Sequence, residues 1–169
     1  MDFSTEFVAL RERIVQEQDK AFVCKQNVEV AGRVAALVST FDSVAQRKLL
    51  GVVPTGGSSH AHEYRLLFAV PALDETALED WWEYALQVEQ ALVQPDMGHD
   101  FSLVSVILVT GSVSRPVQKK LRKLASERQY KGAQAGWSSV RIAVVGLEGR
   151  DIHTNRMGDS LKNILKPIV

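Results

Sequence analysis

The most distinctive chemistry in this sequence is a run of basic side chains in its C-terminal third. Between residues 115 and 131 a single acid, Glu127, accompanies seven Lys and Arg residues. These bases are Arg115, Lys119, Lys120, Arg122, Lys123, Arg128 and Lys131. Such side chains supply most contacts with phosphate groups. The run predicts a cationic face that is solvated, paired within the chain, or bound to an acidic protein or to nucleic acid.

A second candidate is the turn that follows an apolar run ending at Thr110. Backbone N–H groups and a helix start in such a turn are suited to anions. The residues that would form this site are Thr110, Gly111, Ser112, Ser114, Arg115 and Arg150. The glycine pattern matches neither a phosphate-binding loop nor a dinucleotide fingerprint. An ordinary capped helix is therefore the alternative interpretation.

Histidines and carboxylates form two further groups. His60 and His62 stand two apart, and Asp96, His99 and Asp100 cluster later in the chain. Imidazole and carboxylate are suitable zinc ligands. Nothing in the spacing brings the two groups together, so we expect exposed histidines, no metal site and no cofactor.

Nucleophilic catalysis has little support in the sequence. Cys24 has no evident base beside it, and no serine stands in a nucleophile-elbow pattern. We therefore predict no catalytic residues and a protein that is not an enzyme. Trp81 and Trp82 are adjacent in a predicted helix, where successive side chains point about 100° apart. At least one indole should reach a flank and could anchor a partner.

Most of the chain divides into elements that would position these residues. Helical spacing of apolar side chains covers residues 3–21, 75–93, 114–128 and 157–164. Asp74 is placed to cap the second of these helices, and Pro116 is tolerated in the first turn of the third. Strand-length apolar runs cover residues 49–53, 64–70, 101–110 and 140–145. Turn residues 54–59 separate the first two runs, which predicts an antiparallel pair.

Residues 28–41 fit either a helix or a strand, because their apolar positions match both periods. As a strand the segment gives the order α-β-β-β-α-β, and as a helix it gives two N-terminal helices before a hairpin. From residue 101 the order β-α-β-α predicts a partly parallel sheet. The predicted fold is one α/β domain over residues 1–169, with helices packed on a mixed sheet.

With the strand interpretation, the element order resembles the restriction-endonuclease-like fold. Nucleases of that fold use an acid on one strand and an acid-x-Lys pair on the next. Asp42 would be the first acid, and Glu63-Tyr64-Arg65 stands where the pair would be. Arg replaces Lys there and cannot serve as the same proton-transfer group. The resemblance implies a nucleic-acid-binding domain without a complete catalytic motif.

Composition and charge limit the class of protein. The 169 residues carry a formal net charge of zero, with 46% hydrophobic residues and one cysteine. No internal disulfide is possible, and no run approaches the ~20 apolar residues of a membrane span. Acids at Asp2 and Glu6 do not fit a secretory signal. We expect a cytoplasmic protein without membrane contact.

The neutral total conceals a marked asymmetry. Residues 66–100 contain eight acids and no Lys or Arg, whereas residues 101–169 contain twelve Lys and Arg and four acids. Such asymmetry points to an electrostatic partner. The leading prediction is a non-enzymatic interaction or assembly domain. It would bind a protein partner or a second copy of itself in a homo-oligomer. The alternatives are nucleic-acid binding and the binding of a small anion or nucleotide.

Overall fold

One helix, three strands and then alternating helices and strands follow each other along the chain. The computed structural model describes residues 2–49, 53–132 and 134–169. The elements are α1 (Phe3–Glu17), β1 (Val23–Val30), β2 (Arg33–Leu49), β3 (Val53–Ala69), α2 (Glu75–Leu92), β4 (His99–Thr110), α3 (Arg115–Leu121), β5 (Ser126–Gln129), β6 (Trp137–Gly146), β7 (Asp151–Thr154), the 3-10 turn η1 (Arg156–Gly158) and α4 (Asp159–Leu165). The predicted α/β class with helices on a mixed sheet is confirmed.

All described strands belong to a single sheet. Its order is β1-β2-β3-β4-β6-β5, and β7 pairs with the same edge of β6 as β5 does. Strand β1 pairs with β2, and β2 with β3, in antiparallel orientation. In contrast, β3 pairs with β4, and β4 with β6, in parallel. The parallel part predicted from residue 101 onward is therefore present, and it is joined by α2 and α3.

A tight turn resolves the ambiguous segment at residues 28–41. Ala31 and Gly32 have φ values of 48° and 85°, and Val30 pairs with Arg33 across the turn. Two positive φ values are what a two-residue hairpin of type I′ requires. The segment is therefore neither one helix nor one strand, because β1 ends and β2 begins inside it. The order α-β-β-β-α-β nevertheless results.

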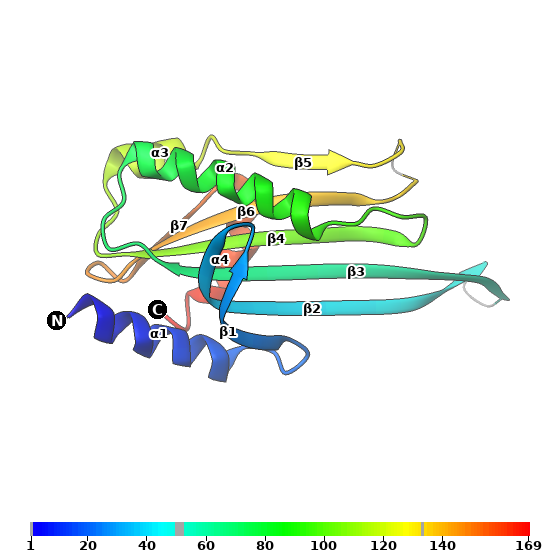
Figure 1. Ribbon diagram of the computed structural model, residues 1–169, viewed down its shortest axis with the longest axis horizontal. Coiled ribbons are helices and arrows are strands. Elements are labelled where there is room, and N and C mark those ends of the chain that lie inside the picture. The colour runs from blue at the N-terminus through cyan, green and yellow to red at the C-terminus, as the bar shows by residue number, and fades with distance from the viewer. Residues whose placement is uncertain (1, 50–52, 133) are drawn as a thin grey trace.

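The next hairpin is longer than the sequence indicates. Residues 54–59, predicted as a loop, belong to β3, which pairs with β2 along most of its length. That prediction was wrong because turn-forming residue types do not prevent pairing within a long ladder. The strand predicted at 49–53 overlaps residues 50–52, which lie outside the described residues. In Figure 1 this hairpin extends beyond the ends of β4 and β6.

The predicted basic helix at residues 114–128 was also too long. Helix α3 ends at Leu121, and residues 126–129 instead form β5, which pairs antiparallel with β6. Leu124 and Ala125 continue the helical spacing of apolar residues, but the residues that follow them pair with the edge of β6. This is a tertiary contact that local periodicity does not reveal.

Strands β5 and β7 share one edge of β6 and leave a short gap between them. Residues 126–129 pair with 137–140, and residues 151–154 pair with 143–146. Asn155 fills the gap: its Oδ1 accepts from the N–H of Ile142 at 3.1 Å, and its Nδ2 donates to the carbonyl of Val140 at 3.1 Å. The side chain thereby completes the hydrogen bonds of β6.

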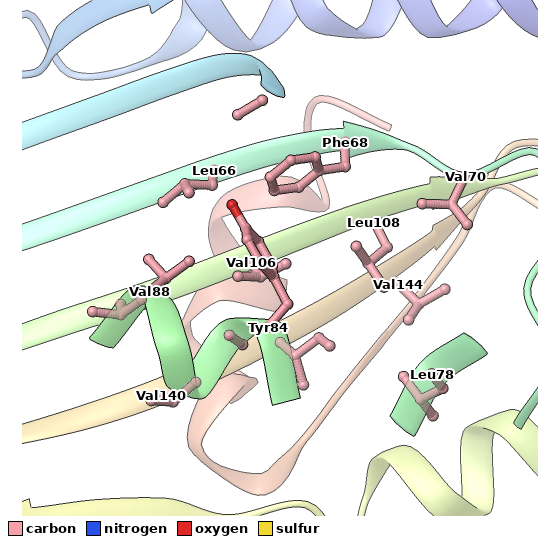
Figure 2. Close-up of a cluster of buried hydrophobic side chains, with 14 of the residues drawn as sticks. Leu66, Phe68, Val70, Leu78, Tyr84, Val88, Val106, Leu108, Val140 and Val144 are labelled. Atoms are coloured by element: carbon pink, nitrogen blue, oxygen red, sulfur yellow. The ribbon is translucent and has the colours of Figure 1, made fainter. Parts of the chain in front are cut away.

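Each face of the sheet carries its own hydrophobic core. Helices α2 and α3 cover one side, called here the α2 face, where Tyr84 and Val88 pack against Leu66, Val106 and other strand residues (Figure 2). Helices α1 and α4 cover the opposite side, the α1 face. Among the described helices, none is long and apolar enough to cross a membrane.

Candidate functional site

A cavity of about 360 Å³ lies on the α1 face, between the C-terminal part of α1, α4 and the sheet. Most of its walls are apolar and come from both helices and from three strands. The apolar lining includes Ile14, Leu37, Leu67, Ile107, Leu161 and Leu165. Sites for small organic molecules have volumes of about 300–1,000 Å³ and predominantly apolar walls. In size and lining the cavity resembles such a site.

A row of polar side chains crosses the sheet beside this cavity. Ser39 of β2 lies opposite Arg65 of β3, and both line the cavity. Arg65 lies opposite Ser105 of β4, which in turn lies opposite Arg141 of β6. Ser39, Arg65, Ser105 and Arg141 are called the polar row below. Because side chains alternate along a strand, this row lies on the same face as the apolar residues two positions further on.

Two contacts hold the guanidinium of Arg65 in place. Its Nε lies 2.8 Å from Glu63 Oε1, and the side chains of Arg65 and Glu63 are 11% and 16% exposed. The guanidinium also lies over the ring of Phe22, at 4.1 Å from the ring centre. A cation held over an aromatic face and by a half-buried carboxylate has little freedom to move. Arg65 is therefore fixed at the border between the cavity and the polar row.

The other end of the polar row carries polar atoms without partners. Within the described residues, Ser105 Oγ and Arg141 Nε are buried and make no hydrogen bond. Burial lowers the pKa of Arg141, Glu63 opposes this, and Arg65 adds to it by repulsion. The guanidinium still remains charged at physiological pH. Leaving such buried groups unpaired costs roughly 1–3 kcal/mol each, so a bound acceptor there would relieve a penalty.

The structure brings the turns after Thr110 and Gly146 side by side, but acidic groups lie beside them. The N–H groups of Leu147 and Glu148 donate to the carbonyls of Thr110 and Gly111, at 3.0 and 2.9 Å. A Cβ atom on Gly111 would be 3.4 Å from Glu148 Oε1, and Asp151 Oδ1 lies directly against Gly146. Carboxylates in these positions repel an anion.

The remaining residues of that turn have ordinary structural surroundings. The Ser114 hydroxyl caps α3 by accepting from the N–H of Val117 at 3.5 Å. Ser112 is exposed before it. Arg150 lies in the exposed turn before β7, where it borders a shallow depression with Glu6 and Arg13. The structure therefore places Ser112 and Ser114 at a capped helix start, and Arg150 in a separate turn.

The basic residues do not share one helix face. Lys120 pairs with Glu79 of α2, Arg122 Nη1 lies 2.7 Å from Asp159, and Arg128 Nε lies 3.2 Å from Glu89. Lys131 lies in the turn after β5. Arg115, Lys119 and Lys123 line a shallow depression with Glu75, and none of the three is in an ion pair found among the described residues.

Both tryptophans of α2 pack against the hydrophobic core of the α2 face and are half-buried. The ring of Trp81 lies 4.7 Å from that of Phe68, and the guanidinium of Arg33 lies 4.2 Å from its centre. The most exposed tryptophan among the described residues is Trp137, which stacks on Phe101.

The residues behind the nuclease resemblance lie on opposite faces of the sheet. Asp42 is opposite His62, and its Oδ1 lies 2.5 Å from His62 Nδ1. Glu63 is the next residue of β3, so its side chain points to the other face with Arg65. Asp42 and Glu63 are therefore not placed to bind one metal ion together.

The two histidine groups, in contrast, meet on the α2 face. Parallel pairing of β3 with β4 places His60 opposite His99, and the ring centres of His60, His62 and His99 are 5.3–6.4 Å apart. Asp96 Oδ1 lies 3.2 Å from His60 Nε2. In the described part of the chain, no group of three or more His, Cys, Asp or Glu side chains is arranged to hold one metal ion.

Comparison with known proteins places the chain in a family. The model of the Domain of unknown function (DUF8052) matches residues 8–167. The chain belongs to this family. The comparisons with curated proteins and with solved structures returned no match.

Sequence reasoning missed the polar row of this DUF8052 domain. Ser105 and Arg141 interrupt runs of apolar residues in β4 and β6, and a charge within a mostly buried strand was the available signal. Their proximity to Arg65 depends on the register of three strands that are distant in the sequence.

Proposed function

We propose that this domain binds a small organic anion with an apolar body, held in the cavity between α1, α4 and the sheet. The polar row carries the proposal. Its members Ser39 and Arg65 line the apolar cavity, and Ser105 and Arg141, each with an unpartnered buried atom, continue the row on the next two strands. Carboxylate and phosphate oxygens are the acceptors that guanidinium groups bind best, often through two parallel hydrogen bonds. Ser105 Oγ would add a third donor.

The local charge favours a monoanion. Arg65 and Arg141 bring two positive charges, and Glu63 neutralises one of them. A single carboxylate would complete the balance, whereas a dianionic phosphate would leave an unpaired charge in a half-buried place. Glu17 and Asp19 also border the cavity, but both are exposed, and Asp19 already accepts from the N–H of Ala21 at 2.8 Å.

The apolar walls indicate what the rest of the ligand is. Each methylene group that leaves water for an apolar site contributes about 0.8 kcal/mol. Affinity should therefore rise with the length of an aliphatic carboxylate until the cavity is full, and then fall. An aliphatic or aryl carboxylate is the ligand class that combines this body with a monoanionic head.

The test is a series of straight-chain carboxylates from butyrate to dodecanoate, measured by calorimetry and by thermal shift. We expect a maximum at intermediate length, and binding of the matched primary amides weaker by about tenfold or more. Arg141→Gln and Ser105→Ala should weaken binding. Arg115→Gln, an exposed arginine on the opposite face, is the matched control and should leave binding unchanged.

Two results would contradict the proposal. Equal affinity for amides and carboxylates would show that the polar row does not bind the anionic group of the ligand. A chain whose melting temperature responds to no member of the series, while its circular dichroism shows a folded protein, would remove the ligand itself.

A second candidate function is electrostatic docking of an acidic partner on α3. It is supported by Arg115, Lys119 and Lys123, which no acid of the described residues pairs with. The partner favoured by the charge pattern is an acidic protein surface, including that of a second copy. Acid-to-base assembly through α2 has less support, since Glu79, Asp80 and Glu89 already pair within the chain.

Light scattering over a range of salt concentrations tests the self-association form, because exposed charge contacts weaken as the Debye length falls below ~8 Å. A monomer at low ionic strength would exclude it. Fluorescence anisotropy with labelled DNA and RNA tests the nucleic-acid alternative. In that case the double variant Lys119→Gln, Lys123→Gln should lower both the affinity and its salt slope.

A further inference from the structure

Two histidine–carboxylate pairs lie side by side on the α2 face, opposite to the polar row. His62 Nδ1 is 2.5 Å from Asp42 Oδ1, and His60 Nε2 is 3.2 Å from Asp96 Oδ1. The two imidazole rings are 5.3 Å apart between centres and inclined at 61°. Both side chains remain open to solvent, with exposed fractions of 25% and 21%.

Each ring uses one nitrogen for its carboxylate and keeps the other. Among the interactions of the described residues, His62 Nε2 and His60 Nδ1 have no partner. Histidines that bind metal ions almost always donate the second ring N–H to a carboxylate or carbonyl, which fixes the tautomer and makes the free nitrogen a stronger ligand. Asp42 and Asp96 are placed to do this for His62 and His60.

The separation of the rings also suits a shared ion. A zinc–nitrogen bond is about 2.1 Å long, so two imidazoles on one tetrahedral ion have ring centres roughly 5–6 Å apart. The observed 5.3 Å falls in this interval.

His99 has a supporting role in this cluster. It is 1% exposed, its Nδ1 lies 2.7 Å from the carbonyl oxygen of Ala135, and its Nε2 lies 2.8 Å from Ser102 Oγ. With both nitrogens engaged it has no lone pair to offer. The centre of its ring lies 6.1 Å from that of His60 and 6.4 Å from that of His62. This buried ring therefore limits the movement of the two more exposed rings.

We propose that His60 and His62 bind a divalent transition-metal ion such as Zn²⁺, with Asp42 and Asp96 orienting the two rings. Imidazole ligands select zinc, copper, nickel or cobalt over magnesium and calcium, which prefer oxygen. Two protein ligands leave the remaining coordination positions to water or to an incoming molecule. The nearby carboxylates of Asp42 and Asp96 offset the charge of the ion.

Calorimetric titration of the folded protein with Zn²⁺, and with Co²⁺ followed by its visible absorption, tests the site. We expect 1:1 binding that Mg²⁺ does not reproduce. His60→Ala and His62→Ala should each weaken binding by at least tenfold, and Asp42→Asn by about tenfold through the orientation of His62. The matched control is His153→Ala, because His153 forms a similar single pair with Asp151 at 2.8 Å and should not contribute.

Unchanged zinc affinity in both His60→Ala and His62→Ala, or equal loss in His153→Ala, would overturn the proposal. Circular dichroism of each variant separates lost binding from lost folding. As a second measurement, ring resonances of the unsubstituted protein should respond to Zn²⁺ at His60 and His62 and not at His153. Because the carboxylate ligand is proposed for the opposite face, each proposal can fail without the other.

Discussion

At the scale of single residues, Asn155 stabilises the sheet through two hydrogen bonds from its side chain to the backbone of β6. It is fully buried, and both ends of its amide bond to β6. Substitution by Ala would leave the Ile142 N–H and the Val140 carbonyl unpaired away from water. We expect Asn155→Ala to lower the free energy of unfolding by about 2–3 kcal/mol or more. Urea denaturation measures this, with the exposed Asn163→Ala as a control that should change little.

Tyr84 gives a second expectation at this scale. Its hydroxyl donates to the Val30 carbonyl at 2.7 Å, and burial raises the pKa of Tyr84 to about 12, with Arg33 opposing. In the unfolded chain the phenol ionises near pH 10. The unfolded state therefore loses its proton first, and the stability that Tyr84 contributes is full below pH 10 and is lost as the pH rises toward about 12.

The loss amounts to about 2–3 kcal/mol, at roughly 1.4 kcal/mol for each pKa unit. Denaturant unfolding of the parent protein and of Tyr84→Phe at pH 9 and pH 11.5 measures it. The variant should be less stable at pH 9, and the difference should narrow at pH 11.5. A constant difference would show that Tyr84 does not titrate in this way.

The candidate sites show what residue-level reasoning can reach. The bases from Arg115 to Lys131 were readily found, because charge is visible in the sequence. Whether each base is paired depended on which acids lie beside it, as Lys120 and Glu79 show. The polar row was not found, since Arg65, Ser105 and Arg141 meet only through strand register.

At the scale of elements, the β1–β2 turn is built with one unfavourable residue. Ala31 adopts a φ of 48°, a conformation that costs a residue with a Cβ roughly 1–2 kcal/mol. Ala31→Gly should therefore raise the free energy of unfolding by about 0.5–1 kcal/mol, which chemical denaturation can measure. The same change in a helix, Ala77→Gly in α2, should lower it by about 0.5–1 kcal/mol. Equal signs for the two variants would contradict this account.

Elements with strong local sequence signals were predictable, and elements that depend on tertiary contacts were not. Helix α2 and its Asp74 cap were confirmed, because a long periodic segment and its cap are local signals. Residues 28–41 were unresolved because Ala-Gly is a weaker hairpin signal than Asn-Gly. The end of α3 and the whole of β5 depended on the edge of β6 and were missed.

For the whole molecule, the charge split of the sequence becomes a set of contacts within one chain. Asp80, Glu79 and Glu89 of α2 pair with bases from three other segments. The pair between Glu89 and Arg128 should matter most for stability. Glu89 is fully buried and also accepts a hydrogen bond from Ser138 Oγ at 2.6 Å. Its Oε2 lacks an aligned hydrogen bond and depends on the nearby charge of Arg128.

Removing that charge should therefore be costly. We expect Arg128→Gln to lower the free energy of unfolding by about 3 kcal/mol, because it leaves a carboxylate buried without its counter-charge. Lys120→Gln breaks an exposed pair with the same helix and should cost at most about 1 kcal/mol. Unfolding titrations of the two variants compare them directly, and similar costs would show that burial of Glu89 does not matter.

Strand β3 has a consequence for how this family can change length. His60 and His62 point to one face, and Glu63 and Arg65 point to the other, solely because a strand alternates. Inserting or deleting one residue there would exchange the faces and dismantle both proposed sites in a single event. Only insertions or deletions of an even number of residues would keep each side chain of β3 on its face of the sheet. Tolerated length changes should therefore fall at the far end of the hairpin, away from residues 60–67.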